Sequence, residues 1–511
     1  MNKLGEIDEI YRQRLVKLER LKKEAGYDPF KVDRYVKANS SQEIKDRFGY
    51  LKEDEVAEEE VSLAGRIMRL RFHGKASFAH IRDETGDIQL YFQYDKLGEE
   101  KYGFFKTWVD TGDILGVKGF PFRTKRGELS IWVTDFSLLS KALRALPEKW
   151  HGLKDVETRH RQRYLDLMVN LDSRRKFVIR SKVIKLFREL LDARGFMEVE
   201  TPILQPIATG AAAKPFITYH NALDMNLYLR IAPELYLKRL LVGGFEKVYE
   251  IGRNFRNEGI STQHNPEFTS LELYWAYANY EDMIKLFEDI LSKIVREITG
   301  GLKLEYNGME IDFTPPWRRI TMKEAIKLYA GIDFDNIGNL EEVKAIAKSK
   351  GVELEKADSL PAAMFELFEE LVEEKLVQPT FVIGYPVEVS PLAKRNAGNP
   401  GLTDRFELFI AGFEVANAFS ELNDPIDQRR RFEEQAKRRE RGDEEAHPMD
   451  EDFVRALEYG MPPAAGIGIG IDRFVMILTG STSIREVILF PHLRPERGID
   501  EDGEGDTEER T

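Results

Sequence analysis

The chain has no cysteine among its 511 residues. Without cysteine, disulfide frameworks, thiolate zinc sites, iron–sulfur clusters and cysteine nucleophiles are all excluded. The sequence also lacks a continuous apolar run of about 18 residues, the length that a membrane-spanning helix requires. Its first twenty residues contain no apolar core of a signal peptide. We therefore expect a soluble, cytoplasmic protein that makes no membrane contact.

Basic residues are outnumbered, with 76 Lys and Arg against 89 Asp and Glu and a formal net charge of −13. This balance argues against a nucleic-acid partner only weakly, because the charges are unevenly distributed. Residues 500–511 hold seven acids and one arginine, which gives −6 of the −13, whereas residues 11–52 hold twelve basic and six acidic residues. Net charge does not show where a basic face lies.

Changes in hydrophobic pattern predict four regions along the chain. They are a helical extension at 1–60, a small β-domain at 61–145, a large α+β region at 146–495 with a helical insertion at about 322–378, and an acidic, disordered tail at 496–511.

Five short alternating segments follow one another from Val61 to about Leu139, separated by turn sequences such as DETGD and KRGE. This pattern is typical of a five-stranded β-barrel of the OB type, whose aromatic face binds single-stranded nucleic acid. A barrel whose aromatic residues serve only as its core fits the spacing equally well.

The large region mixes helical and strand patterns. SKVIKLFRELLDARG predicts an amphipathic helix with Val183, Phe187 and Leu190 on one face and Gly195 at its end. A strand, FMEVETPIL, follows and contains Pro202 near its end. The predicted fold class is therefore α+β.

The glycine-rich segment GIGIGIDR, residues 466–473, does not have the G-x-G-x-x-G spacing of a dinucleotide loop. Alternating Gly and Ile suit a tightly packed strand that a backbone or ligand approaches closely. Arg473 comes directly after this strand, where its guanidinium could lie over a purine and reach a phosphate.

A second motif, FRNEGISTQHNPEFTSLELY, spans residues 255–274. Arg256 and Glu258 alternate in a strand and share one face, and a short loop brings in His264 before the chain returns through Phe268. A strand–loop–strand of this composition suits a nucleoside triphosphate, with Arg256 on the α-phosphate and His264 on the outer phosphates. A surface ion pair or a core phenylalanine explains any one of these residues, but not all of them together with Arg473.

With these motifs the chain resembles the class II aminoacyl-tRNA synthetases that carry an N-terminal OB domain and handle lysine, aspartate and asparagine. Within that subgroup it is most similar to the lysyl-tRNA synthetase family. The resemblance covers roughly residues 1–495 and includes the helix–strand ending at Pro202, the FRNEG…HNPEFT hairpin and GIGIGIDR. It implies an antiparallel catalytic sheet flanked by helices. It also implies a homodimer formed through the helix–strand segment that ends at Pro202.

The resemblance also implies roles for individual residues. Arg256, His264 and Arg473 would be catalytic, with Phe268 and Arg473 on either side of the adenine. Mg²⁺ is the implied cofactor, held by carboxylates that match Glu407 and Glu414, since hard oxygen ligands are what this ion prefers. The implied ATP-binding residues are Arg256, Glu258, His264, Phe268, Glu407 and Arg473. The implied lysine-binding residues are Gly210, Glu234, Arg256, Glu272, Tyr274, Asn417 and Glu421. In the OB domain Phe78 would stack on the middle anticodon base, Gln89 would bind its edge, and Arg66 would be a further contact.

The choice of amino acid also has a physical argument. A lysine substrate carries an ammonium group at each end and needs carboxylates, whereas an aspartate pocket would need Arg or Lys. The segments around Glu234, Glu272 and Glu421 are acidic or neutral, which favours lysine. Glu272 and Tyr274 are two residues apart on a strand and face the same way.

The implied reaction joins L-lysine to ATP as lysyl-adenylate and then transfers lysine to the terminal ribose of tRNA(Lys). Catalysis would come from positioning and charge neutralisation, not from a covalent enzyme intermediate. Three alternatives remain. One is an enzyme that lysylates a protein, against which the intact OB region argues. Another is an inactive synthetase-like RNA-binding or regulatory protein, and the third is dinucleoside polyphosphate synthesis as a side activity.

Overall fold

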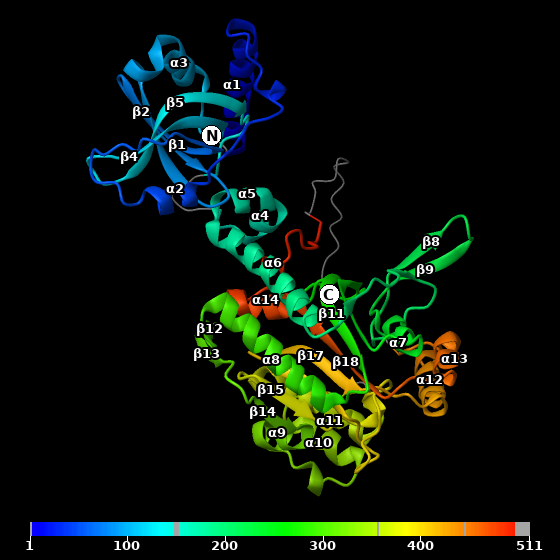
Figure 1. Ribbon diagram of the computed structural model, residues 1–511. Coiled ribbons are helices and arrows are strands. Elements are labelled where there is room, and N and C mark those ends of the chain that lie inside the picture. Colours follow the sequence, from blue (N-terminus) through cyan, green and yellow to red (C-terminus); the bar gives the residue numbers. More distant parts are fainter. Residues whose placement is uncertain (1–2, 148–152, 355–356, 444–445, 496–511) are drawn as a thin grey trace. The chain divides into compact units, whose positions relative to one another are not determined.

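The computed structural model describes residues 3–147, 153–354, 357–443 and 446–495 (Figure 1). The acidic tail and its predicted disorder lie outside these residues. The chain divides into two compact units, Met1–Lys154 and Asp155–Thr511. Each unit has its own hydrophobic core.

The first unit is a closed five-stranded barrel with the strand order β1-β2-β3-β5-β4. Alternate residues of β2 and β3 point into the barrel, as the period of two in the sequence predicts. The predicted OB-type barrel is therefore confirmed. The elements of this unit are α1 (Lys3–Glu24), η1 (Pro29–Lys31), α2 (Ser41–Phe48), β1 (Val61–His73), β2 (Ala76–Arg82), β3 (Asp87–Gln93), α3 (Tyr94–Trp108), β4 (Ile114–Arg123) and β5 (Leu129–Ser140).

Helix α3 follows β3 directly and packs onto the barrel through an aromatic contact. Phe105 of α3 stacks on Phe92 of β3 with ring centroids 3.8 Å apart, and both side chains are fully buried. Burial of large aromatic side chains is the dominant stabilising contribution in a core of this size.

The second unit is built on an eight-stranded sheet in the order β14-β15-β16-β17-β18-β11-β10-β6. All neighbouring strands are antiparallel except the pairs β14–β15 and β10–β6. The predicted antiparallel catalytic sheet in an α+β fold is thus confirmed. The strands are β6 (Met197–Glu198), β10 (Lys247–Phe255), β11 (Glu267–Ala276), β14 (Arg318–Thr321), β15 (Thr380–Ile383), β16 (Arg405–Ile410), β17 (Phe413–Ser420) and β18 (Ala464–Gly470).

One face of this sheet is covered by α6 (Leu171–Asp192), α8 (Tyr280–Thr299) and α14 (Ile471–Thr479) (Figure 1). Helix α8 is strongly amphipathic and begins with a capping box formed by Asn279 and Asp282. Its apolar face is fully buried against the sheet and the other two helices. Because these helices occupy one face, the opposite face remains available for a ligand.

The remaining elements connect or extend this sheet. Helices α9, α10 and α11 lie between β14 and β15 and form a second apolar cluster. The further elements are α4 (Val156–Arg161), α5 (Arg163–Val169), β7 (Leu204–Gln205), β8 (Ile217–His220), β9 (Met225–Leu229), α7 (Glu234–Val242), β12 (Lys303–Tyr306), β13 (Met309–Asp312), α9 (Met322–Ala330), η2 (Phe334–Asn336), α10 (Leu340–Ser349), α11 (Leu360–Leu371), η3 (Glu373–Lys375), η4 (Val387–Val389), α12 (Pro425–Glu440), α13 (Glu451–Glu458) and η5 (Ile484–Glu486).

Three local expectations differ from the structure in their extent. The strand predicted to contain Arg256 and Glu258 is β10, which ends at Phe255, so both residues follow the strand. The amphipathic helix starts earlier than its apolar pattern suggested and forms α6, with Val183, Phe187 and Leu191 buried and Leu190 only partly buried. The segment FMEVETPIL pairs with the sheet only over Met197–Glu198. Proline has no N–H to donate to a strand ladder, which fits the early end of this pairing before Pro202.

None of the helices within the described residues is long and apolar enough to cross a membrane.

Candidate active site

A cavity of about 640 Å³ is lined by residues of the sheet strands β10, β11, β17 and β18. It collects residues from distant parts of the sequence, including helix α7 and the start of α14. The predicted site residues that line it are Gly210, Glu234, Arg256, Glu258, His264, Phe268, Glu272, Tyr274, Glu407, Glu414, Asn417 and Arg473. Their individual roles remain predictions.

The hairpin of β10 and β11 places Arg256 against Phe268. Asn254 pairs with Phe268 in the strand register, and the backbone N–H of Arg256 donates to the Pro266 carbonyl at 2.9 Å. The Arg256 guanidinium lies 5.1 Å from the centre of the Phe268 ring. Its Nε is buried and has no hydrogen-bond partner among the described residues. The hairpin thus holds an arginine with unused donor capacity beside an aromatic surface.

Arg473, in the first turn of α14, reaches from β18 towards both β17 and the hairpin loop. Its Nη1 donates to the Glu414 carbonyl at 2.7 Å and lies 3.2 Å from the Glu414 carboxylate. Its Nη2 lies 3.4 Å from His264 Nε2. Burial and the positive charge of Arg473 lower the pKa of His264. The predicted nucleotide-binding residues are therefore close together at this end of the cavity.

The carboxylates predicted to bind metal lie on neighbouring strands. Glu407 on β16 is buried, and its carboxylate accepts hydrogen bonds from the Tyr385 hydroxyl at 2.7 Å and from Arg405 Nη2 at 2.5 Å. Burial raises the pKa of Glu407, and the charge of Glu414 raises it further. Two carboxylates that repel each other favour a cation between them, so their chemistry fits Mg²⁺.

Two acidic residues near this pair were missed by the sequence interpretation. Burial and the charge of Glu407 raise the pKa of Glu369 to about 7 and that of Glu373 to about 9. Glu369 lines the cavity from α11. The run EELVEEK gave no signal for them, because a helical acidic run usually faces solvent. No group of three or more possible metal-binding side chains occurs among the described residues.

Glu234 and Glu272 also line the cavity, and we call the part that they line its acidic end. Burial, followed by the charge of Glu234, raises the pKa of Glu272 to about 8. The Tyr274 hydroxyl donates to Glu272 Oε2 at 3.3 Å. Gly210, whose φ is +95°, lies beside Glu234 and lines the cavity. Asn417 lines the same cavity and accepts a hydrogen bond from Arg405 Nε at 3.2 Å.

Glu421 is the one predicted lysine-binding residue that does not line the cavity. Its side chain is fully buried, and Oε2 lies 2.5 Å from Nζ of Lys238, a residue that sequence reasoning did not single out. A side chain at Gly466 would clash with both Glu421 Oε1 and the Tyr274 ring. Gly466 is therefore needed to let Glu421 approach the cavity.

The three predicted anticodon contacts lie on the outer face of the barrel. Phe78 on β2 is 5.0 Å from Tyr91 between ring centres, within an aromatic group that also contains Phe122 and Trp132. Since all four side chains are only partly buried, they do more than fill the core. Their exposed faces fit the nucleic-acid interpretation better than the core-only alternative.

The two polar residues among the predicted anticodon contacts, Gln89 and Arg66, form different hydrogen bonds within the protein. Gln89 on β3 donates to Glu128 at 2.8 Å and accepts from the Ser130 hydroxyl at 2.8 Å. Arg66 donates to the Gly112 carbonyl at 2.7 Å, and burial lowers the pKa of Arg66. Gln89 is therefore held in a fixed orientation, whereas Arg66 is engaged with the protein's own backbone.

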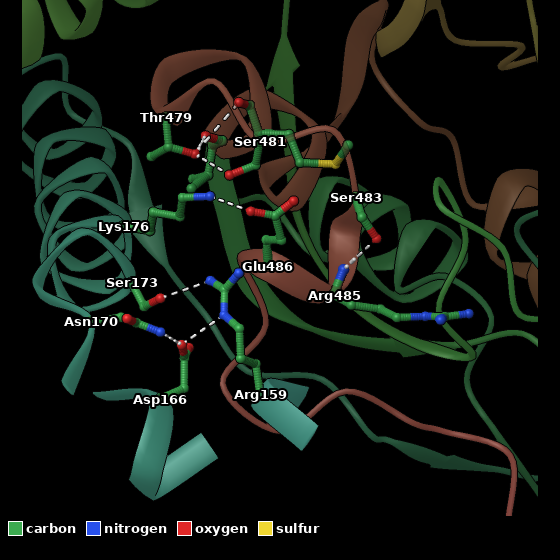
Figure 2. A network of polar contacts seen from close by, with 12 residues as sticks. Arg159, Asp166, Asn170, Ser173, Lys176, Thr479, Ser481, Ser483, Arg485 and Glu486 are labelled. Carbon is green, nitrogen blue, oxygen red and sulfur yellow. Dashed lines mark hydrogen bonds and ion pairs between the residues drawn. The ribbon is translucent and has the colours of Figure 1, made fainter. Parts of the chain in front are cut away.

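A polar network behind the cavity fixes the helix that carries Arg473. Figure 2 shows Arg159 linked to Asp166 and Ser173, and Lys176 of α6 paired with Glu486 of η5. One turn further along α6, Arg180 pairs with Asp472 and donates to the Thr269 hydroxyl at 2.9 Å. Asp472 in turn accepts from the Thr269 backbone N–H at 2.7 Å.

This network joins α6, β11 and α14, and Asp472 is the residue directly before Arg473. The position of Arg473 at the cavity is therefore tied to α6, the helix of the helix–strand segment that ends at Pro202.

Two protein-family models match the chain. The model of class II tRNA synthetases for aspartate, lysine and asparagine matches residues 155–494, and the OB-fold nucleic acid binding domain matches residues 61–139. The chain is 59% identical over 489 residues to a lysine–tRNA ligase of Syntrophomonas wolfei, covering 96% of this chain and 98% of the relative. It is 57% identical over 492 residues to the lysine–tRNA ligase of Pelotomaculum thermopropionicum, covering 96% of each chain. A lysine–tRNA ligase of Carboxydothermus hydrogenoformans is 56% identical over 490 residues, covering 96% of this chain and 99% of the relative. The chain belongs to the lysine–tRNA ligase family of the class II tRNA synthetases.

Proposed function

We propose that this protein activates L-lysine with ATP and transfers the lysyl group to the terminal ribose of tRNA(Lys). The observation that carries this proposal is one cavity lined by two groups of residues with opposite chemistry. Arg256, His264 and Arg473 form the basic group, with Arg473 in contact with His264, while Glu234 and Glu272 form the buried acidic group. A nucleoside triphosphate suits the first group and a diamine the second.

At the acidic end the substrate would be held through both of its ammonium groups. Glu234 and the Gly210 carbonyl would accept the α-ammonium. Glu272, Tyr274 and Glu421 would bind the ε-ammonium, and Asn417 the substrate carboxylate. An aspartate or asparagine side chain offers no second cation to the buried carboxylates, which would stay unpaired at a large cost in free energy.

In the first step a carboxylate oxygen of lysine attacks the α-phosphorus of ATP in line with the bond to the β-phosphate. That bond breaks as the new oxygen–phosphorus bond forms, and pyrophosphate leaves with its electron pair. Arg256 would hold the reacting carboxylate and α-phosphate, and His264 would contact the outer phosphates. Phe268 and Arg473 would hold the adenine between them, and Glu258 would bind its amino group. Catalysis of this kind rests on positioning and electrostatic stabilisation.

Glu407 and Glu414 would hold Mg²⁺, which supplies charge neutralisation at the phosphates when bound. In the second step a ribose hydroxyl of the tRNA attacks the lysyl carbonyl, and AMP leaves. The OB unit would bind the anticodon through Phe78 and Gln89, with Arg66 as a further contact.

A homodimer through α6 and a cytoplasmic location belong to the same proposal. Helix α6 has two large apolar side chains in solvent, with Leu171 47% and Val178 65% exposed. Leu171 and Val178 are seven residues apart and lie on the same side of α6, where a second copy of the chain would cover both. Sedimentation equilibrium should give twice the mass of one chain, and the substitution V178D should shift the protein towards monomer.

The test of the proposed function is charging of tRNA(Lys) with labelled lysine in the presence of ATP and Mg²⁺. We expect acid-precipitable lysyl-tRNA whose ester is lost at alkaline pH, and no product when the tRNA ends are oxidised with periodate. ATP binding without any charging or adenylate formation would instead support the inactive, RNA-binding alternative.

A further inference from the structure

Lys238 is buried between two of the carboxylates assigned to the lysine substrate. Its Nζ lies 2.6 Å from Glu234 Oε1 and 2.5 Å from Glu421 Oε2, and none of its side chain is exposed. The rings of Phe419 and Phe453 lie 5.3 Å and 6.0 Å from the same ammonium group. Two carboxylates and two aromatic rings therefore surround this cation, and it does not reach the cavity.

Lys238 offsets one of the three carboxylates assigned to the ammonium groups of the substrate. Glu234, Glu272 and Glu421 bring three carboxylates, and Lys238 brings one ammonium, so the fully ionised cluster has a net charge of −2. A lysine substrate brings two ammonium groups. Without Lys238, three buried carboxylates would face two cations, and the one left unpaired would take up a proton.

The way in which Lys238 binds the two carboxylates leaves acceptors for the substrate. Its hydrogen bond to Glu234 uses Oε1. At Glu421 it forms an ion pair with Oε2, while Oε1 lies beside Gly466, which lines the cavity. Neither Glu421 oxygen accepts a hydrogen bond from the described residues. The buried cation thus orients both side chains without using all of their oxygens.

We infer that Lys238 is a positioning residue for the amino-acid substrate, which ties Glu234 to Glu421 and sets the net charge of the pocket. This inference rests on the proposed function, because it assumes that the two carboxylates bind the ammonium groups of lysine. It adds a residue outside the cavity to the determinants of lysine affinity.

The groups around Lys238 determine how lysine binding is expected to depend on pH. Burial raises the pKa of Glu234 and of Glu421, and the ammonium of Lys238 opposes both shifts. Arg405 also opposes the rise in the pKa of Glu234, whereas the charges of Glu234 and then Glu272 add to the rise in the pKa of Glu421. The nearby His447 is not a second cation at neutral pH, because burial and the charge of Lys238 lower its pKa to about 4.

The substitution K238M tests the inference, since methionine keeps the side-chain length and removes the charge. In ATP–pyrophosphate exchange at neutral pH we expect the lysine KM to rise by about tenfold or more while the ATP KM changes by less than about twofold. Raising the pH should narrow the difference in lysine KM from the native enzyme, because deprotonation of the carboxylates then depends less on the charge of Lys238.

R239M is the matched control on the same helix. Arg239 pairs with Asp450 and Asp452 and does not line the cavity, so its loss should leave both KM values near the native ones. An unchanged lysine KM in K238M would overturn the inference. So would a rise in both KM values that does not depend on pH, which is the result expected of a purely structural residue.

A second variant covers the case in which K238M does not fold. K238M/E421Q removes the two opposite charges together and is compared with E421Q alone. We expect a further rise of about threefold or more in the lysine KM, because Glu234 has also lost its partner. Equal values in the two variants would overturn the inference. Failure of the native enzyme to use lysine at all would instead overturn the proposed function.

Discussion

The guanidinium of Arg473 donates to the backbone carbonyl of Glu414 at 2.7 Å and lies 3.2 Å from its carboxylate. Arg473, which is assigned to the adenine, is thus in contact with Glu414, which is assigned to Mg²⁺. In this state the arginine partly neutralises the carboxylate that a cation would otherwise occupy. Binding of Mg²⁺ with ATP and placement of Arg473 over the adenine are therefore expected to be coupled.

The substitution E414Q tests the metal assignment. It removes a charge but keeps the side-chain shape, and the carboxylate is 38% exposed, so the melting temperature should change little. We expect pyrophosphate exchange to fall by about 100-fold at fixed Mg²⁺, with partial recovery as Mg²⁺ is raised. A variant with native activity and native Mg²⁺ dependence would exclude Glu414 as a ligand. The exposed Glu310 offers a control in E310Q.

Lysine affinity should depend on pH through Glu272, whose pKa is raised to about 8 by burial and by Glu234. The carboxylate is protonated below that pH, so lysine must displace a proton to bind. The lysine KM should therefore fall as the pH rises from about 6 to about 8, a range over which the ε-ammonium of lysine stays fully charged.

The variant E272Q should have a high lysine KM with a much weaker pH dependence, while the ATP KM follows the native curve. A native lysine KM that is constant from about pH 6 to about pH 8 would contradict the raised pKa.

The two glycines at 466 and 468 of β18 provide a graded comparison. A Cβ at Gly466 would clash with the Tyr274 ring and Glu421 Oε1, whereas a Cβ at Gly468 would lie 3.7 Å from Glu272 Cγ, an ordinary contact. We expect G466A to lose about 100-fold in kcat/KM for lysine and G468A to lose far less. Equal losses would show that the space at Gly466 is not required for lysine binding.

Anticodon binding and amino-acid activation should be separable. Stacking of one base on an aromatic side chain contributes about 1–3 kcal/mol. F78A should therefore raise the tRNA KM in charging by about tenfold or more and leave tRNA-independent pyrophosphate exchange unchanged. F30A, which removes an exposed phenylalanine of the same unit, should leave both intact. An unchanged tRNA KM in F78A would remove Phe78 from the interface.

Stability of the first unit should depend on Asp83. Burial opposes ionisation of its carboxylate, but hydrogen bonds from Ser41, Lys37 and Thr85 lower its pKa to about 2. The depressed pKa means that this stabilisation is present above the unfolded pKa near 4 and is lost as the pH falls towards about 2.

D83N should lower the free energy of unfolding by about 1–2 kcal/mol at neutral pH, because an amide cannot accept all of these bonds. The difference in the free energy of unfolding between D83N and the native protein should shrink in acid. Chemical denaturation followed by a probe of the barrel would measure both effects, and an equal loss at all pH values would contradict the role of the charge.

Much of this architecture could be predicted from the sequence, because the relevant signals are local. Alternating apolar residues mark the barrel strands, and the spacing of Arg256, His264 and Phe268 along one hairpin places them together. Lys238 could not be predicted, since its partner Glu421 lies far along the chain and a helical lysine usually faces solvent. The strand FMEVETPIL was predicted too long, and only Met197–Glu198 pair with the sheet, because backbone pairing depends on the neighbouring strand and not on local propensity.

The most direct test of the central claim is amino-acid-dependent ATP–pyrophosphate exchange by the purified protein, without tRNA and across all twenty amino acids. The acidic end of the cavity predicts exchange with lysine alone. Exchange with aspartate or asparagine would contradict the assignment of that end to lysine, and no exchange with any amino acid by a folded, ATP-binding protein would contradict the proposed activity.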